Sequence, residues 1–306
     1  MKRINLGSSN LEVSQMVLGM MRSSQNDANA LEVLLEKALA LDINFVDHAD
    51  IYAWKTPAEI LYGEVLKKRP EFKEKFVVQT KCGICSGYYD SSYEHIMKSV
   101  DQSLERMGLD KIDVLLLHRP DALMEPEEIA RAFDDLESSG KVLHFGVSNM
   151  NPGQISKIQR CVSQPLVADQ MQFSIVHSAL IDQGIFVNMR DENAVMRDGS
   201  LLDYAQEKRI SIQAWSIVQA GWEDGCFIDH PKYSALNEKL EELAKKYNVT
   251  KSAIAVAWIL RHPANIMPIA GTVNPAHLEE MTKAFDIKLT REEWYGLYLS
   301  TGKKLP

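Results

Sequence analysis

The sequence predicts an α/β fold of the (β/α)8 type, a TIM barrel, with an N-terminal β-hairpin and a C-terminal helical tail. Eight short apolar runs recur along the 306 residues, and segments with a 3.6-residue apolar period lie between them. No G-x-G-x-x-G loop follows the first run, as an open dinucleotide-binding sheet would usually require. Because single barrels often reach this length, we expect one domain spanning residues 1–306.

The predicted elements follow one another in a regular order. The hairpin is expected at residues 2–13, with its turn at 7–10. The barrel strands are expected at 15–19, 44–49, 76–82, 112–119, 142–149, 166–174, 210–217 and 265–271. Helices are expected at 28–42, 56–68, 91–109, 125–139, 201–209 and 275–285. Pro57 lies just inside one predicted helix start, and Gly140 stands where another helix should end. Residues 175–198 are expected to form a long loop that covers the site.

Composition excludes several classes of protein. The net charge of −8 argues against nucleic acid as a partner. No window of about 18 apolar residues predicts a membrane span, and the N-terminus turns polar too soon for a secretory signal. The four cysteines are interpreted as reduced thiols of a cytoplasmic protein. Cys82 and Cys85 form a C-x-x-C pair, but a redox motif would want a helix between them, so no redox role is expected.

Polar side chains stand at the ends of several predicted strands. Asp47 ends the second strand and is followed by Tyr52, Lys81 ends the third, His118 the fourth and Asn149 the fifth. In a (β/α)8 barrel the C-terminal ends of the strands meet at one rim, where catalytic residues sit. The repetition on successive strands predicts an active site at this rim.

These motifs resemble those of the aldo-keto reductases, most closely the bacterial YdhF-type oxidoreductases. The matching segments are residues 46–52, 80–83, 118–121, 140–142 and 146–149, and the likeness runs from Leu18 to Thr272. The resemblance implies an enzyme that reduces an aldehyde or ketone with a nicotinamide cofactor. It also implies a catalytic tetrad of Asp47, Tyr52, Lys81 and His118.

The chemistry of carbonyl reduction supports this tetrad. The reaction needs a hydride at carbon and a proton at oxygen, and free tyrosine, with a pKa of about 10, is a poor acid. A lysine ammonium about 4 Å away stabilises the phenolate by roughly 4 kcal/mol at an effective dielectric near 20. This energy corresponds to about three pKa units, so we expect Tyr52 to have a pKa near 7 and to act as general acid. Asp47 is expected to keep Lys81 charged, and His118 to donate to the developing alkoxide.

The resemblance also implies a cofactor wall. The nicotinamide carboxamide is expected against Ser148, Asn149 and Gln170, with Trp215 stacked on the ring. The phosphates are expected near Ser216 and the N-terminus of the helix at 275–285. The residues expected to bind the cofactor are Gly19, Met20, Ser148, Asn149, Gln170, Trp215, Ser216, Gly271, Thr272, His277 and Glu280.

The sequence departs from the family pattern at the adenosine end of this wall. NADPH-specific relatives usually carry lysine and arginine around the 2′-phosphate, whereas Gly271 and His277 stand at the matching positions here. NADPH is the expected cofactor by family habit, with NADH as the alternative.

Two other functions stay open. A metal-dependent barrel hydrolase would use Asp47, His48, Asp50 and His118, but the first strand lacks the H-x-H that such sites commonly carry. His48 and Asp50 are therefore expected to be structural, and no metal is expected. A cofactor-binding regulatory subunit would share the barrel without turnover. The expected partner is a small carbonyl compound, without nucleic acid or membrane, and the expected assembly is a monomer or small homo-oligomer. The entrance is expected near Trp54, Leu123–Met124, Trp222 and 294–306.

Overall fold

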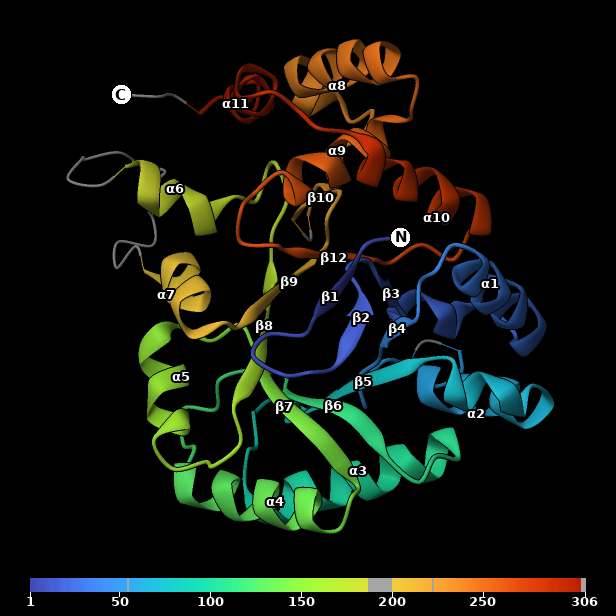
Figure 1. Cartoon of the computed structure of the whole chain (residues 1–306), viewed down its shortest axis with the longest axis vertical. Helices are drawn as coiled ribbons and strands as arrows, with labels where there is room; N and C mark the ends of the chain where they lie inside the picture. Colours follow the sequence, from blue (N-terminus) through green and yellow to red (C-terminus); the bar gives the residue numbers. More distant parts are fainter. Residues whose placement is uncertain (54, 187–199, 222, 304–306) are drawn as a thin grey trace.

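A computed structural model describes residues 1–53, 55–186, 200–221 and 223–303, and its centre is a closed barrel of parallel strands (Figure 1). The strands follow the order β12-β3-β4-β5-β6-β7-β8-β9 around the barrel. Their bounds are β3 (Val17–Gly19), β4 (Phe45–Asp47), β5 (Val77–Cys82), β6 (Ile112–Leu117), β7 (Val142–Ser148), β8 (Leu166–Gln172), β9 (Ser211–Trp215) and β12 (Met267–Ala270). Each lies within a predicted strand, so the predicted barrel is confirmed.

Helices surround the barrel on its outside (Figure 1). Their bounds are α1 (Ala28–Ala40), α2 (Ala58–Lys68), α3 (Tyr93–Met107), α4 (Pro126–Ser138), α5 (Pro152–Gln159), α6 (Ala179–Ile185), α7 (Leu201–Lys208), α8 (Ser234–Tyr247), α9 (Lys251–Leu260), α10 (Pro275–Thr282) and α11 (Arg291–Leu299). In the described part of the chain, four 3-10 turns accompany them: η1 (Met21–Gln25), η2 (Pro70–Glu74), η3 (Pro231–Tyr233) and η4 (Lys283–Asp286). None of the helices in the described residues combines the length and the apolar character that a membrane span requires.

Local signals explain several helix boundaries. The Asp27 carboxylate accepts a hydrogen bond from the Ala30 N–H and begins α1, and Gly108, in the left-handed conformation, ends α3.

Two predicted elements need correction. The segment 175–198 is not a plain loop, because α6 forms within it; its residues 187–198 lie outside the described part of the chain. The helix predicted at 275–285 ends at Thr282 and continues as the 3-10 turn η4.

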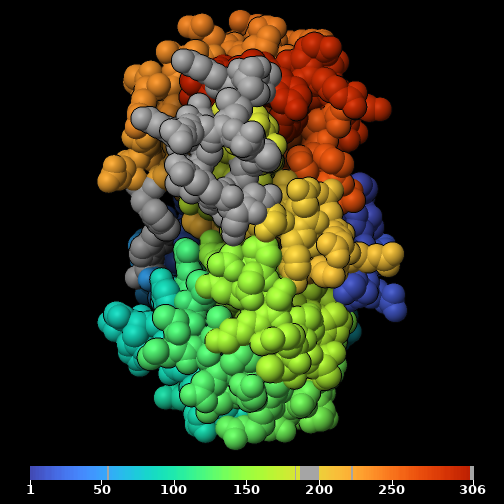
Figure 2. Space-filling view, turned by 90° about the vertical axis from the view of Figure 1, so that its left-hand side faces the viewer, coloured from blue at the N-terminus to red at the C-terminus, as the bar shows by residue number. Residues whose placement is uncertain are grey.

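The predicted hairpin is confirmed as β1 (Arg3–Asn5) paired with β2 (Glu12–Ser14), and it lies beside α7 (Figure 2). Its turn docks closely on the barrel, because the Gly7 N–H donates to the Ser211 hydroxyl at 2.7 Å. A Cβ atom on Gly7 would lie 2.2 Å from the Val167 carbonyl oxygen, and the φ of this residue is +56°. Only glycine satisfies both conditions.

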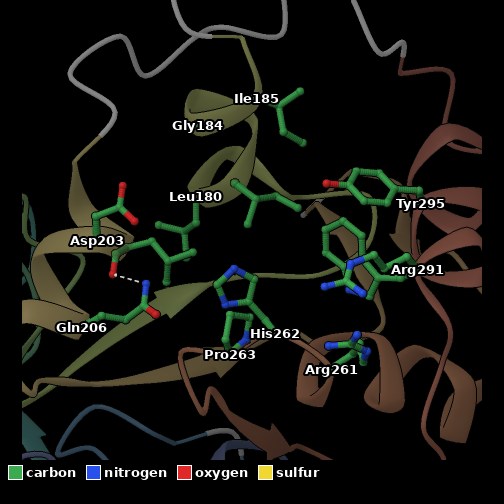
Figure 3. A pocket seen from close by; sticks show the side chains of 13 residues that line it. Leu180, Gly184, Ile185, Asp203, Gln206, Arg261, His262, Pro263, Arg291 and Tyr295 are labelled. Carbon is green, nitrogen blue, oxygen red and sulfur yellow. Dashed lines mark hydrogen bonds between the residues drawn. The ribbon is translucent and has the colours of Figure 1, made fainter.

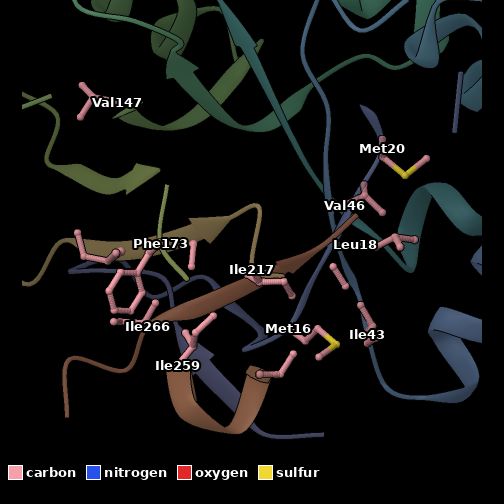
Figure 4. Close-up of a cluster of buried hydrophobic side chains, with 14 of the residues drawn as sticks. Met16, Leu18, Met20, Ile43, Val46, Val147, Phe173, Ile217, Ile259 and Ile266 are labelled. Carbon is pink, nitrogen blue, oxygen red and sulfur yellow. The ribbon is translucent and has the colours of Figure 1, made fainter. Parts of the chain in front are cut away.

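Two apolar layers hold the barrel together. Strand side chains such as Leu18 and Val46 point outward into the layer beneath the helices (Figure 4). Inside the barrel, Leu6 and Val13 of the hairpin segment pack with Phe45 and other apolar strand residues. Successive side chains of a strand alternate between the two sides. The interior is therefore lined at one end by apolar side chains, and polar side chains follow further along the same strands.

A second two-stranded sheet lies outside the barrel. It consists of β10 (Gln219–Gly221) and β11 (Gly225–Cys226), paired antiparallel between β9 and η3 in the chain. This pair was not predicted, because its strands are too short to show a periodic pattern.

Candidate active site

The ammonium group of Lys81 is the centre of the polar cluster at the C-terminal ends of the strands. Lys81 is fully buried, and its Nζ lies 2.8 and 2.9 Å from the two carboxylate oxygens of Asp47. The same atom donates to the His48 carbonyl oxygen at 2.6 Å and to the Tyr52 phenolic oxygen at 3.1 Å. Because an ammonium group can only donate, the Tyr52 oxygen accepts this bond. The Tyr52 O–H is therefore left to donate to another group.

His118 completes the predicted tetrad. It follows β6 directly, and its backbone N–H donates to the Cys82 carbonyl oxygen at 2.8 Å, which extends the pairing with β5. Its ring is nearly perpendicular to the ring of Tyr52, with the two centroids 6.0 Å apart. The structure therefore brings the four residues of the predicted tetrad together.

Three buried glutamines fix the orientation of Asp47. Gln79 and Gln170 each donate from Nε2 to Asp47 Oδ1, at 2.6 and 3.0 Å. The same two amide groups donate to Gln213 Oε1, at 2.7 and 3.0 Å. Gln79 and Gln213 were not among the predicted site residues. The signal that could have found them is their place in the alternation of the strands, because Gln79 lies two residues before Lys81.

Burial and charge set the protonation states of this cluster. Burial opposes the charged form of Lys81, but the neighbouring Asp47 and Tyr52 outweigh it, so the pKa of Lys81 is raised. The pKa of Tyr52 is also raised, because burial of its hydroxyl outweighs the lowering effect of Lys81. The expectation of a pKa near 7 for Tyr52 is therefore wrong. Burial, reinforced by Lys81, lowers the pKa of His118 well below its usual value. Near neutral pH the cluster thus contains a charged lysine, a neutral phenol and a neutral imidazole.

His48 and Asp50 occupy different surroundings from the tetrad. The His48 ring is fully buried against Tyr62, with centroids 4.8 Å apart, and burial with the nearby lysine lowers its pKa to about 3. Burial and a neighbouring glutamate raise the pKa of Asp50 to about 7. No three of the side chains Asp47, His48, Asp50 and His118 bring ligand atoms together at metal-binding distances. Their arrangement does not suit the metal-dependent hydrolase alternative.

The predicted nicotinamide wall divides into two layers. Asn149 and Trp215 line a cavity of about 320 Å³ beside the tetrad, together with Arg119. Ser148 is buried behind Asn149, where its hydroxyl donates to the Gln170 carbonyl oxygen and accepts from the Asn149 amide, both at 2.7 Å. Ser148 and Gln170 therefore hold Asn149 in place and do not line the cavity themselves. The position of Arg119 in this cavity was not expected from the sequence.

The segment predicted to hold the nucleotide phosphates lies between β12 and α10. Gly271 and Thr272 are half-buried there, and Gly271 accepts a hydrogen bond from Arg22 Nη1 at 3.4 Å. Gly19 packs against this strand so closely that a Cβ atom on it would lie 2.8 Å from Ile269 Cγ2. No carboxylate pairs with Arg22 in the part of the chain that the structure describes. Arg22 was not among the predicted cofactor residues, and it brings a positive charge beside Gly271.

Four other predicted cofactor residues lie less favourably. The Met20 side chain is fully buried in the apolar layer, so only its backbone could face a ligand. Glu280 forms an ion pair with Lys283 at 2.6 Å, His277 is exposed on α10, and the Ser216 hydroxyl donates to Gln219. The N-terminus of α10 also offers fewer donors than expected. Its first residue is a proline, and the N-cap side chain already accepts from the following N–H.

A second cavity lies at the side of the barrel, between α6, α7 and α11 (Figure 3). Its volume is about 590 Å³, larger than that of the cavity beside the tetrad, and it is lined by apolar side chains with Arg261, His262 and Arg291 among them. No tetrad residue lines either cavity, but the smaller one is lined by Arg119, which follows His118 in the chain, and by Asn149 and Trp215 at the C-terminal ends of barrel strands. We therefore assign the chemistry to the smaller cavity. Of the expected entrance residues, Trp294 lines this side cavity, and Trp54 and Trp222 lie outside the described residues.

One buried carboxyl group near this wall makes stability depend on pH. Asp169 is fully buried, its Oδ2 has no partner, and burial raises its pKa to about 8. An unfolded aspartate has a pKa of about 3.9, so between roughly pH 4 and 8 the folded state binds more protons than the unfolded state. The free energy of unfolding contributed by this group therefore falls as pH rises through that window and is constant above it.

We expect Asp169→Asn to remove this part of the pH dependence. Urea denaturation from pH 5 to 9 should show a flatter profile for the variant and a higher free energy of unfolding than the wild type at pH 8 and above. Asp101→Asn, at an exposed carboxylate, is the matched control and should follow the wild-type profile. A variant profile parallel to that of the wild type would show that Asp169 is ionised in the folded protein.

Taken together, a closed (β/α)8 barrel and a buried Asp–Lys pair against a tyrosine define an oxidoreductase of the carbonyl-reducing class. Comparison with known proteins gives the family. The model of the aldo/keto reductase family matches residues 15–297, so the chain belongs to that family, and the resemblance seen in the motifs is confirmed.

Individual relatives are similar along nearly the whole chain. The chain is 36% identical to the 6-dehydroglucose reductase of Agrobacterium fabrum, with all of both chains covered. It is 32% identical to the oxidoreductase YdhF of Escherichia coli, over 96% of this chain and 95% of that protein. Among solved structures, the thermostable aldo-keto reductase Tm1743 has a TM-score of 0.77 at 23% identity, covering 98% of this chain and 100% of that one. This last likeness supports the fold.

Proposed function

We propose that this enzyme reduces aldehyde and ketone carbonyls to alcohols with NADPH and that Tyr52 is the general acid. The observation that carries the proposal is the contact of Lys81 Nζ with the Tyr52 oxygen at 3.1 Å, within a buried pair with Asp47. NADPH supplies the hydride when it is bound. Tyr52 donates its proton to the carbonyl oxygen, and the charge of Lys81 stabilises the phenolate that remains. Asp47 keeps Lys81 charged.

His118 has a separate role in this proposal. Its imidazole is neutral near pH 7, so one ring nitrogen carries a proton and can donate a hydrogen bond. We propose that this N–H orients the carbonyl and stabilises the alkoxide as it develops. A neutral donor suits the site, because a second positive charge beside Lys81 would be repelled.

The residues of the smaller cavity, which Asn149, Trp215 and Arg119 line, suit a nicotinamide ring. Asn149 offers an amide that can donate to and accept from a carboxamide, and the aromatic face of Trp215 gives a platform for stacking. The cavity that they line has a volume of about 320 Å³, which has room for one such ring. We propose that Ser148 and Gln170 act on the cofactor through Asn149, whose side chain they hold.

Arg22 supports the choice of NADPH over NADH. Gly271 and His277 provide no permanent positive charge for the adenosine 2′-phosphate, whereas Arg22 lies against Gly271. We expect Arg22→Met to weaken NADPH binding about 10- to 100-fold, the usual scale for a hydrogen bond to a charged group, and to leave NADH binding unchanged. Fluorescence titration with both cofactors measures this. Equal weakening of both would place Arg22 away from the 2′-phosphate.

The opposite change, His277→Arg, adds a permanent positive charge on α10 and should tighten NADPH binding.

The smaller cavity, which Asn149 and Trp215 line, also indicates which carbonyl compounds to test. Arg119 lines it, its guanidinium lies 6.0 Å from the Trp215 ring centroid, and no carboxylate pairs with it among the described residues. A free guanidinium binds carboxylate or hydroxyl groups. Two relatives are named 6-dehydroglucose reductase, and we therefore propose that hydroxylated aldehydes such as oxidised sugars belong in the panel with simple aldehydes and ketones.

The decisive experiment is a titration with NADPH and NADH followed by a carbonyl panel read at 340 nm. Turnover with NADPH is the expected result. Cofactor binding without turnover of any carbonyl would favour the regulatory-subunit alternative, and loss of hydrolytic activity on chelation would favour the hydrolase alternative. We further propose a cytoplasmic monomer or small homo-oligomer, in keeping with four free cysteines and a net charge of −8.

A further inference from the structure

Outside the proposed catalytic centre, three side chains of different chemistry meet beside the loop between β5 and α3. Cys85 and Asp90 belong to the loop, and His95 lies in the first turn of α3. The Cys85 Sγ lies 4.0 Å from the His95 ring nitrogens, and Asp90 Oδ2 lies 3.8 Å from His95 Nδ1. The ligand atoms of the three residues all lie within 4.8 Å of one another. We propose that Cys85, Asp90 and His95 bind a divalent transition-metal ion of the zinc class.

The backbone holds the three side chains in place without the ion. The Cys85 N–H donates to the Tyr88 carbonyl oxygen at 3.0 Å, and the Asp90 N–H donates to the Gly83 carbonyl oxygen at 2.9 Å. These bonds close a small antiparallel hairpin that carries the thiol and the carboxylate. The His95 N–H bonds to the N-cap side chain of α3 at 3.3 Å, so the imidazole comes from a defined first turn. The site is therefore largely preformed.

Outer hydrogen bonds orient two of the proposed ligands. Asp90 Oδ1 accepts from the Ser92 N–H at 2.9 Å, and the other carboxylate oxygen is the one turned toward His95. The other ring nitrogen, His95 Nε2, lies 3.3 Å from the hydroxyl of Ser99, which is only 5% exposed. A metal-bound histidine almost always hydrogen-bonds through its other ring nitrogen. Ser99 is placed to receive that bond if Nδ1 binds the ion.

The donor set selects the class of ion. One sulfur, one imidazole nitrogen and one carboxylate oxygen suit Zn²⁺, whereas Mg²⁺ and Ca²⁺ take oxygen ligands. Bond lengths of roughly 2.0–2.3 Å place the ligand atoms of a tetrahedral zinc about 3.3–3.8 Å apart. Small side-chain rotations therefore close the observed separations onto an ion. The Asp90 and His95 side chains are 30% and 22% exposed, which leaves the fourth position open to water.

The site would connect two parts of the barrel rim. Its loop follows Lys81 by a few residues, and the neighbouring Ser91 N–H donates to Asp121 Oδ2 at 3.0 Å, in the loop after His118. An ion bound by Cys85 and His95 would tie this loop to α3. We therefore expect Zn²⁺ to raise the thermal stability of the protein.

Titration of the untagged, reduced protein with Co²⁺ tests the proposal. A thiolate ligand gives an intense charge-transfer band in the near ultraviolet, and tetrahedral Co²⁺ gives visible bands that Zn²⁺ should abolish. The expected result is one Co²⁺ per chain with both sets of bands, and a rise in Tm on adding Zn²⁺. Ser99→Ala should weaken binding about 10-fold or more, as removal of an outer hydrogen-bond partner does.

Variants separate this site from other thiols. Cys85→Ser should lose the charge-transfer band, and His95→Gln should lose the visible bands, with circular dichroism spectra like those of the wild type. Cys226→Ser is the matched control, because Cys226 is also a free thiol but lies outside the cluster, and it should bind as the wild type does. Absence of the bands in the wild type, or bands that persist in Cys85→Ser, would overturn the proposal.

Discussion

Replacing Tyr52 with phenylalanine is expected to reduce turnover about 10²- to 10⁴-fold, the usual contribution of a general acid. The substitution removes only the hydroxyl, whose oxygen accepts a hydrogen bond from Lys81 at 3.1 Å. Burial raises the pKa of this phenol, so it is protonated throughout the neutral range, and its donation of the proton depends on the charge of Lys81 to stabilise the phenolate. Steady-state assays at 340 nm with NADPH and an aldehyde measure the effect.

Cofactor binding provides the control for this variant. Tyr52 does not line the cavity of Asn149 and Trp215, so the NADPH dissociation constant of Tyr52→Phe should match that of the wild type. Loss of binding together with turnover would indicate a general disturbance of the site. A variant that turned over at the wild-type rate would remove Tyr52 from the mechanism.

Replacing Lys81 with methionine is expected to affect both activity and stability. Turnover should fall by a comparable 10²- to 10⁴-fold, because the phenolate of Tyr52 loses its stabilising charge. Asp47, which is 3% exposed, would be left without its partner. Removing one member of a buried ion pair typically costs 3–5 kcal/mol, so the urea midpoint should drop markedly. Tyr52→Phe, by contrast, should leave the midpoint near the wild-type value.

A double variant separates the two effects of Lys81. In Lys81→Met/Asp47→Asn the carboxylate is replaced by a neutral side chain of the same shape, so part of the lost stability should return. Turnover should stay low. If the double variant were as unstable as Lys81→Met, the unpaired charge of Asp47 would not be the cause of the destabilisation. If turnover returned, the charge of Lys81 would have no part in catalysis.

The barrel was predictable from sequence because buried parallel strands form continuous apolar runs, and each of the eight observed strands falls inside such a run. The tetrad was predictable for a related reason, since parallel strands bring their C-terminal ends to one rim. The pKa of Tyr52 could not be predicted in the same way. The Coulomb estimate included the charge of Lys81 but not the burial of the phenol, which proves to be the larger effect.

Other features depend on contacts that no local pattern reveals. Arg22 and Gly271 meet although 249 positions separate them in the chain, so the positive charge near the nucleotide segment was missed. Cys82 and Cys85, for which no redox role was expected, are both free thiols, Cys82 buried and Cys85 partly exposed. The proximity of Cys85 to His95 depends on the hairpin and the first turn of α3, which the sequence analysis did not describe.

The hairpin at the N-terminus affects the route by which a proton can return to Tyr52 between turnovers. Leu6 and Val13 are fully buried, and they close the end of the barrel under the hairpin with apolar side chains. The buried side chains of this apolar cluster carry no hydrogen-bonding group, so they provide no path for a proton relay. On the proposed role of Tyr52 as general acid, we expect each proton that it gives up to be replaced from bulk water through the opening that admits the carbonyl compound. A tightly bound alcohol product would then delay reprotonation until it leaves.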